Sequence, residues 1–89
     1  MKTHIVKSWS HLFVPIEDGR KTHDLRIDDR GYEVGDVMVL QEYDVVAGAY
    51  TGREVRREIT YITSDRFPCA FSSSVLPKPY VILSLRAAA

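Results

Sequence analysis

The sequence predicts an α+β fold that is mainly β: a small, strongly bent antiparallel sheet or barrel of about five strands, with one short, broken helix near the N-terminus. Three observations favour this fold. Runs rich in β-branched and aromatic residues recur along the chain, turn residues separate them, and one segment alone has apolar residues at helical spacing. A chain of 89 residues suffices for one core, so we expect a single domain over residues 1–86 and a frayed tail at 87–89.

The first expected elements are a strand at residues 2–7 and a helix after it. Four apolar side chains fall at i, i+3, i+4 and i+7 and would form one buried stripe on that helix. They are Trp9, Leu12, Phe13 and Ile16. Gly19 can end the helix, because glycine readily adopts the left-handed conformation of a C-terminal cap. Pro15 removes a helical hydrogen bond and clashes with the preceding turn, so we expect the helix to break near residues 11–14.

The second strand, expected at residues 22–27, alternates polar and apolar side chains. Leu25 and Ile27 are predicted to belong to the core. Asp24 and Arg26 then point toward solvent or toward a cleft.

Three further strands are expected after a polar loop that ends in the turn Gly35-Asp36. They span residues 37–43, 53–63 and 80–86, with a hairpin loop at 44–52 and an aperiodic loop at 64–79. Four consecutive apolar residues open the first of these strands, which predicts that both of its faces are covered. In the next strand, Val55, Ile59 and Tyr61 share one face, and we expect Tyr61, like Trp9, to lie in the core. Phe67, Phe71 and Leu76 are expected to pack and order the last loop.

Composition narrows the classes of function. Twelve Lys and Arg balance twelve Asp and Glu, so no overall positive field would draw the chain to long nucleic acids or to membranes. No segment resembles a signal peptide or a membrane helix, and we expect a cytoplasmic protein. Cys69 is the single cysteine, which excludes an internal disulfide and predicts a small, buried, apolar role. The three histidines lack metal-binding spacing, so we expect neither a metal nor a cofactor.

The candidate functional residues gather between positions 19 and 36. Basic and acidic side chains are interspersed there, with Lys21, Arg26 and Arg30 among Asp24, Asp28 and Asp29. One interpretation is a solvated strand edge with weak surface ion pairs. The other is a cleft in which Asp24 orients Arg26 or Lys21, so that their remaining donors can bind a phosphate or a base edge. Lys21 reaches the side of Asp24 and Arg26 only through the turn after Gly19, where the backbone can also approach a ligand closely.

Two other roles concern single residues in or near this stretch. Thr22 beside Lys21 has the groups of an activated hydroxyl nucleophile, although most threonines at strand starts simply satisfy β propensity. Tyr32 and Tyr50 are expected in loops and are the candidates for stacking on a base.

The stretch Gly19-x-Lys21-x-x-Asp24-x-Arg26 resembles the G-x-K-x-x-E-x-R signature of ASCH domains, which belong to the PUA-like superfamily. The likeness extends over nearly the whole chain. The flanking segments that carry it are Lys2-Thr3-His4, Asp29-Arg30-x-Tyr32-x-Val34-Gly35-Asp36, Glu42-Tyr43-Asp44, Tyr50-Thr51-Gly52-Arg53-Glu54, Thr60-Tyr61-Ile62-Thr63 and Tyr80-Val81-Ile82-Leu83. In this order they are similar to a family of small uncharacterised ASCH-type proteins of bacteria and phages. Asp24 departs from the signature, because it shortens the carboxylate of Glu by one methylene.

The resemblance implies a PUA-like β-barrel with a helix beside a cleft, and it implies RNA, a nucleotide or a nucleoside as the partner. The ligand-binding residues that it implies are Gly19, Lys21, Asp24, Arg26, Arg30 and Tyr32. Some ASCH relatives resemble amidohydrolases that deacylate modified cytidine, and others have been proposed to act as ribonucleases. The alternative is therefore a small hydrolase that acts on a modified nucleoside or on RNA and uses Lys21 with Thr22 or Asp24. The amidohydrolase form has a reactive threonine at the position of Asp24, and Asp24 is a poor acyl acceptor, which favours binding over catalysis.

Overall fold

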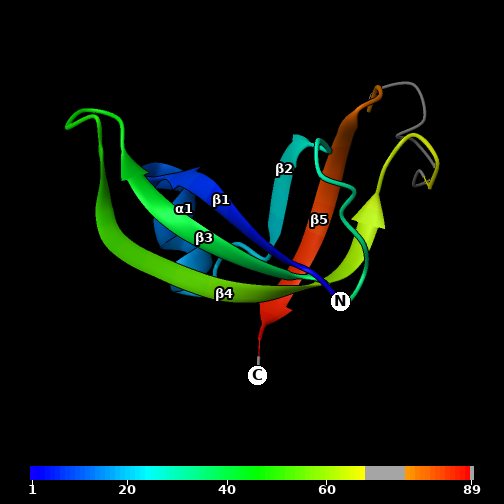
Figure 1. Cartoon of the computed structure of the whole chain (residues 1–89), viewed down its shortest axis with the longest axis horizontal. Coiled ribbons are helices and arrows are strands. Elements are labelled where there is room, and N and C mark those ends of the chain that lie inside the picture. Colours follow the sequence, from blue (N-terminus) through cyan, green and yellow to red (C-terminus); the bar gives the residue numbers. More distant parts are fainter. Residues whose placement is uncertain (68–75, 89) are drawn as a thin grey trace.

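Five strands and one helix form the part of the chain that the computed structural model describes, residues 1–67 and 76–88. In chain order they are β1 (Thr3–Trp9), α1 (Ser10–Glu17), β2 (His23–Ile27), β3 (Val37–Asp44), β4 (Ala49–Thr63) and β5 (Tyr80–Ala87) (Figure 1). The predicted set of five strands with a short helix near the N-terminus is confirmed. The expectations for Cys69 and Phe71 fall outside the described residues.

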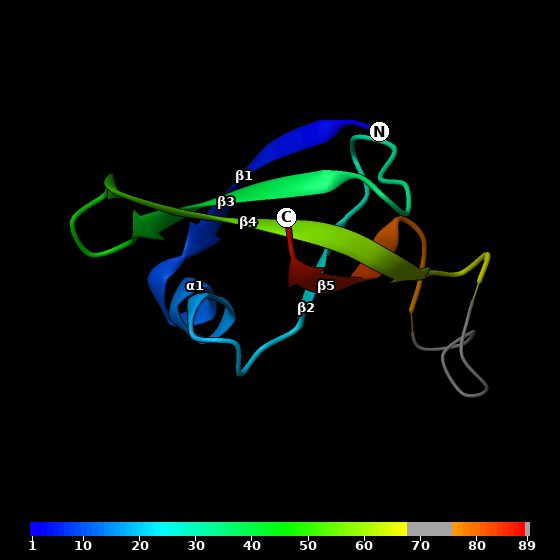
Figure 2. The ribbon, with the colours of Figure 1, turned by 90° about the horizontal axis from the view of Figure 1, so that it is seen from below.

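The strands form one sheet in the order β1-β3-β4-β5-β2, which curls into a half-barrel with β1 and β2 as its edges (Figure 1, Figure 2). β1 pairs with β3 in parallel, and the other three strand pairs are antiparallel. The expectation of a purely antiparallel sheet is therefore wrong. The chain leaves β1, passes through α1 and through β2 at the opposite edge, and only then returns as β3, which is the long connection that a parallel pair requires.

The long strand β4 joins the two halves of the curled sheet. Its first part pairs with β3 and its last part with β5, and the two pairings overlap at Arg57 and Glu58. A bulge interrupts the pairing with β5 between Ile59 and Tyr61. The extra residue of a bulge reverses the alternation of faces, so Ile59 is buried in the core while Tyr61 is 57% exposed. The prediction that Tyr61 lies in the core is wrong for this reason, whereas Val55 packs against the core as expected.

Helix α1 is continuous over its eight residues with Pro15 inside it, so the predicted break is wrong. Pro15 is the sixth residue of this two-turn helix, and its missing N–H removes only one bond from a short ladder. Bonds from outside the helix hold its last turn. The Lys21 N–H donates to the Pro15 carbonyl at 2.9 Å, and the Arg57 guanidinium donates to the Ile16 carbonyl at 2.9 Å. Gly19 follows with a φ of +86°, which confirms that it ends the helix.

Of the expected helical stripe, Phe13 and Ile16 are buried, while Leu12 is partly exposed. Trp9 belongs to β1, where alternate residues point to opposite faces of the sheet. It lies on the convex face and is 48% exposed, so the prediction that it is a core residue is wrong. The helix itself lies on the concave side of the layer formed by β1, β3 and β4 (Figure 2).

The core fills the concave face of the half-barrel. Its buried side chains are Val6, Phe13, Ile16, Tyr32, Met38, Leu40, Ile59, Val81, Leu83 and Leu85. Residues 37–40 of β3 are all buried, which confirms that both faces of this strand are covered. Leu25 and Ile27 are 56% and 46% exposed, so their predicted place in the core is wrong. β2 is an edge strand with an open outer face, and its inward positions hold Asp24 and Arg26 instead.

Candidate functional site

The turn between α1 and β2 carries the first half of the motif and is held by backbone hydrogen bonds on both sides. The Gly19 N–H donates to the last turn of the helix at 3.1 Å, and the Thr22 carbonyl accepts the Leu85 N–H at 2.9 Å. Lys21 lies half-buried between these points, and Thr22 is exposed. Within residues 1–67 and 76–88, no carboxylate lies within ion-pair distance of the Lys21 ammonium. The approach of Lys21 to the rest of the motif stays a prediction.

The second half of the motif is a partly buried ion pair inside the half-barrel, in which the Arg26 side chain is 21% exposed. Asp24 and Arg26 are two residues apart on β2, so both point to the concave face. Asp24 is 4% exposed, and Arg26 Nε lies 2.5 Å from Asp24 Oδ2. Exposed ion pairs are hydrated and contribute little to folding stability. Removing one partner of a pair shielded from water costs more, because the remaining charge is left uncompensated. For these two residues the interpretation as a solvated strand edge is therefore wrong.

Two arginines bridge the open side of the half-barrel between β1 and β2, and we call these contacts the arginine seam. Arg30 Nη1 donates to the Ile5 carbonyl at 2.8 Å, and Arg26 Nη2 donates to the Lys7 carbonyl at 3.4 Å. Because β1 pairs only with β3, its other edge has acceptors without a strand partner. The seam provides donors for two of these carbonyl groups. The N–H groups of Arg26 and Arg30 that make these bonds are therefore not free for a ligand.

Tyr32 is held beside the seam by the loop that follows β2. Asp28 Oδ1 accepts three consecutive backbone N–H groups, those of residues 30–32, at 2.8 to 3.3 Å. The Tyr32 ring packs edge to face on His4 with 4.7 Å between ring centres, and the residue is only 6% exposed. Burial raises the pKa of the Tyr32 phenol above its ordinary value, and the nearby charge of Arg26 opposes this effect. Tyr32 is thus a buried neighbour of the motif rather than an accessible loop residue.

A buried pair between His4 and Asp36 supports Tyr32. His4 Nε2 lies 2.8 Å from Asp36 Oδ2, and the Asp36 carboxylate also accepts the backbone N–H groups of Lys2 and Glu33 at 2.9 and 3.0 Å. Burial of the Asp36 carboxyl favours its neutral form, but these hydrogen bonds outweigh burial and hold the pKa of Asp36 below its ordinary value. The sequence did not indicate this pair, although the alternation along β1 is the signal that turns His4 inward.

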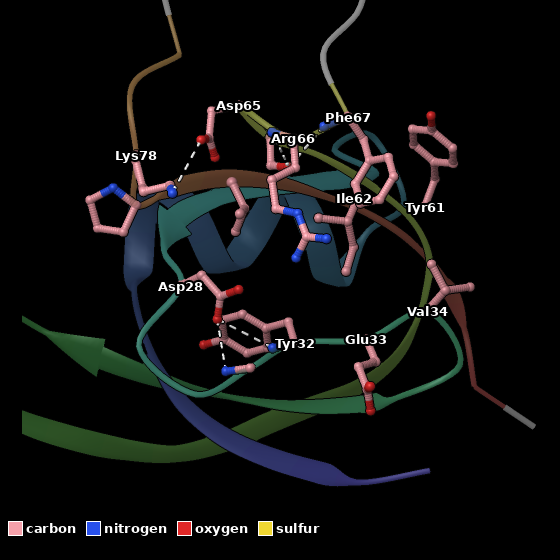
Figure 3. A pocket seen from close by; sticks show the side chains of 14 residues that line it. Asp28, Tyr32, Glu33, Val34, Tyr61, Ile62, Asp65, Arg66, Phe67 and Lys78 are labelled. Carbon is pink, nitrogen blue, oxygen red and sulfur yellow. Dashed lines mark hydrogen bonds and ion pairs between the residues drawn. The ribbon is translucent and has the colours of Figure 1, made fainter.

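A pocket of about 790 Å³ opens where the loop after β2 faces the end of β4 and the start of β5 (Figure 3). Its lining includes Asp28, Tyr32, Tyr61, Asp65, Arg66 and Phe67. Tyr32 belongs both to this lining and to the surroundings of Arg26, so it connects the motif with the pocket. Tyr50, the other predicted stacking residue, lies on β4 outside this lining and packs edge to face on Tyr43 with 5.1 Å between ring centres.

Arg66 is the cation at the middle of the pocket, and its guanidinium points into the opening (Figure 3). Lys78 Nζ lies 3.8 Å from an oxygen of Asp65 at the rim. The sequence did not indicate Arg66 or Phe67 as site residues, because the segment 64–79 has no periodicity from which a face could be predicted.

The pocket offers guanidinium donors, carboxylate acceptors and aromatic faces to a ligand. In the ranges that the structure describes, no group of three or more His, Cys, Asp or Glu side chains is arranged to hold a metal ion. No helix in those ranges is long and apolar enough to cross a membrane.

Comparison with known proteins gives a family and a phage relative. Residues 3–85 match the family described as Domain of unknown function (DUF3850). The chain is also 40% identical over 62 residues to the "Uncharacterized 12.9 kDa protein in GpA 3'region" of Escherichia phage P2. The aligned part is 70% of this chain and 55% of the phage protein, so the chain spans about half the length of that relative. Because the family match runs from the start of β1 into β5 and so covers most of the chain, the chain belongs to the DUF3850 family.

Proposed function

We propose that this chain is a PUA-like module that binds RNA or a nucleotide at the pocket end of the half-barrel. The observation that carries the proposal is the partly buried Asp24–Arg26 pair, which stands at the motif positions, faces the concave side and adjoins the pocket through Tyr32. The ASCH-like motif and the helix on the concave side of a curled sheet support the PUA-like assignment. Gly19, Lys21 and Arg30 do not line the pocket, and their contact with the ligand is part of this proposal.

The groups around the pocket match the chemistry of a nucleotide. Arginine donates to phosphate oxygens and to base edges, and aromatic rings stack on bases, which contributes roughly 1–3 kcal/mol per base. The pairing with Asp24 fixes the orientation of the Arg26 guanidinium before a ligand arrives, so less conformational freedom is lost on binding.

The charge distribution favours a short ligand. The chain has twelve basic and twelve acidic residues, and the Asp24–Arg26 pair compensates itself. Tight binding to a long duplex requires many phosphates to be neutralised at once. A nucleotide or a short single strand needs only the few cations near the pocket.

Amide NMR titrations with mononucleotides and with a short single-stranded RNA test the proposal. We expect shifts within residues 19–36, and we expect Lys21→Ala to weaken binding. Arg20→Ala is the matched control, because Arg20 is the adjacent cation, is exposed and already pairs with Asp18 at 2.9 Å. Ligands that leave residues 19–36 unmoved would refute the proposal.

The same samples distinguish a binding module from a hydrolase. Analysis of acylated cytidine and of RNA after incubation with the protein should show no product if the chain only binds. Turnover that Lys21→Ala abolishes and Arg20→Ala preserves would replace the binding proposal with the hydrolase alternative.

A further inference from the structure

The turn at residues 64–67 fixes Arg66 at the pocket. Ser64 Oγ accepts the N–H groups of Arg66 and Phe67 at 3.2 and 3.3 Å, and the Ser64 N–H donates to the Phe67 carbonyl at 3.3 Å. Ser64 itself is buried. The turn is therefore closed by its own bonds, and the Arg66 side chain reaches over the opening opposite Tyr32 (Figure 3).

Arg66 carries a charge that the acidic lining residues do not compensate. Of the three carboxylates in the lining, Asp65 has Lys78 at 3.8 Å and Glu33 has Lys2 at 3.8 Å, while Asp28 Oδ1 accepts the backbone N–H groups of residues 30–32. In the described ranges no carboxylate lies within ion-pair distance of Arg66, and residues 68–75 contain no Asp or Glu. An anion that enters the pocket therefore meets an arginine that makes no ion pair within the described ranges.

Two accessible aromatic rings lie on one side of this arginine. Tyr61 and Phe67 both line the pocket and are both more than half exposed (Figure 3). The Arg66 guanidinium carbon lies 5.6 Å from the centre of the Phe67 ring. Exposed rings of this kind stack on nucleobases of any sequence.

We propose that the pocket binds one nucleotide through its phosphate, with the Arg66 guanidinium on the phosphate oxygens and the base against Phe67 and Tyr61. The inference rests on the proposed function and specifies its ligand class as a nucleotide with a phosphate monoester, either unattached or at an RNA end. Arginine suits this role because its planar fork donates two parallel N–H bonds to a phosphate, which a lysine cannot do.

The test compares ligands that differ only in the phosphate. The full chain is titrated with the four nucleoside 5′-monophosphates, with the four nucleosides and with inorganic phosphate, and amide NMR follows residues 28–34 and 61–67. We expect the best monophosphate to bind about tenfold or more tightly than its nucleoside, as one charge-assisted hydrogen-bonded contact implies. Inorganic phosphate should bind more weakly than the monophosphate, because it makes no contact with the rings.

Variants assign the effect to one residue. Arg66→Ala should abolish the preference for the monophosphate, and Arg66→Lys should retain only part of it. Arg56→Ala is the matched control, because it removes the same charge from an exposed position on β4 outside the pocket lining and should leave the preference intact. A 5′-phosphorylated RNA tetramer that binds more tightly than its 5′-hydroxyl form would identify an RNA end as the source, and a preference confined to mononucleotides would identify an unattached nucleotide.

Equal binding of nucleoside and monophosphate, or a preference that survives Arg66→Ala, overturns this inference and leaves the proposed function in place, provided that residues 19–36 still respond. Inorganic phosphate that binds as tightly as the monophosphates also overturns it. Failure of every nucleoside, nucleotide and RNA to bind overturns both proposals.

Discussion

Replacing Asp36 with asparagine should destabilise the protein far more than its small change in shape suggests. The Asp36 carboxylate accepts three hydrogen bonds in a buried place, from the backbone N–H groups of Lys2 and Glu33 and from the ring of His4. Asparagine has the same size but only one acceptor oxygen. Its amide nitrogen must therefore face a backbone N–H in either orientation, so at least one donor loses its acceptor.

The magnitude follows from the number and kind of these bonds. A hydrogen bond to a charged group contributes about 1.5–3 kcal/mol, and a buried donor without a partner adds a desolvation cost of about 1–3 kcal/mol. We expect a loss of about 3 kcal/mol in the free energy of unfolding, because such terms are not additive. For a domain of this size, 1 kcal/mol corresponds to roughly 4–8 °C in the melting temperature. The melting temperature of the Asp36→Asn variant should therefore fall by at least about 10 °C.

Thermal and urea unfolding at neutral pH measure this loss, with Asp29→Asn as the matched control. Asp29 is exposed and its nearest cation, Arg30, is 3.7 Å away, so its replacement should change the stability by no more than about 0.5 kcal/mol. The reasoning is refuted if Asp36→Asn is as stable as Asp29→Asn.

The pH dependence of unfolding gives a second check on Asp36. Its folded-state pKa lies below the ordinary value of 3.8, so the native state binds a proton less readily than the unfolded chain. The stabilisation is complete above the unfolded-state pKa and is lost as the pH falls through the folded-state pKa. Below about pH 4 the stability of the natural protein should therefore decline more steeply than that of Asp36→Asn. Parallel curves for the two proteins would contradict the assignment of this titration to Asp36.

Two further predictions concern the ends of β2. Gly19→Ala places a side chain at a φ of +86°, where a Cβ would meet no heavy atom within 4 Å, so its cost of about 1–2 kcal/mol is that of the left-handed backbone alone. Urea unfolding measures it, and a loss below about 0.5 kcal/mol would show that the turn has shifted. Arg30→Ala removes the bond to the Ile5 carbonyl in the arginine seam and should lower the stability by about 1 kcal/mol while accelerating amide exchange in residues 28–32. Exchange rates equal to those of Arg20→Ala would contradict a role for the seam in closing the half-barrel.

Local patterns predicted the elements well, and the errors have identifiable causes. Turn residues and β-branched runs marked the strands because strand propensity and turn chemistry act over a few residues. The faces of the strands were harder to predict. Leu25 and Ile27 lie on one face of β2 and Asp24 and Arg26 on the other, as predicted. Alternation alone, however, does not show which of the two faces the rest of the protein covers. The bulge after Ile59 then reversed the face of Tyr61, and no feature of the sequence indicated that bulge.

Some contacts of the candidate site could be predicted from local spacing, and others depend on the tertiary fold. Asp24 and Arg26 could be predicted to lie together, because two residues at spacing two on a strand always share a face. The pair of His4 with Asp36 joins residues 32 positions apart, and the pocket adds Arg66 from a segment without periodicity. Such contacts depend on how the sheet curls, so no local pattern could have predicted them.

The sequence by itself determined the set of strands, the end of the helix at Gly19 and the motif that holds Asp24 two residues from Arg26. These features depend on backbone conformation and spacing within a few residues. The tertiary structure alone decided that the charged face of β2 points inward, that Tyr32 is buried against His4, and that Arg66 lies across a pocket from Tyr32. Burial is set by which elements cover a face, and the curl of β4 places those elements around the site.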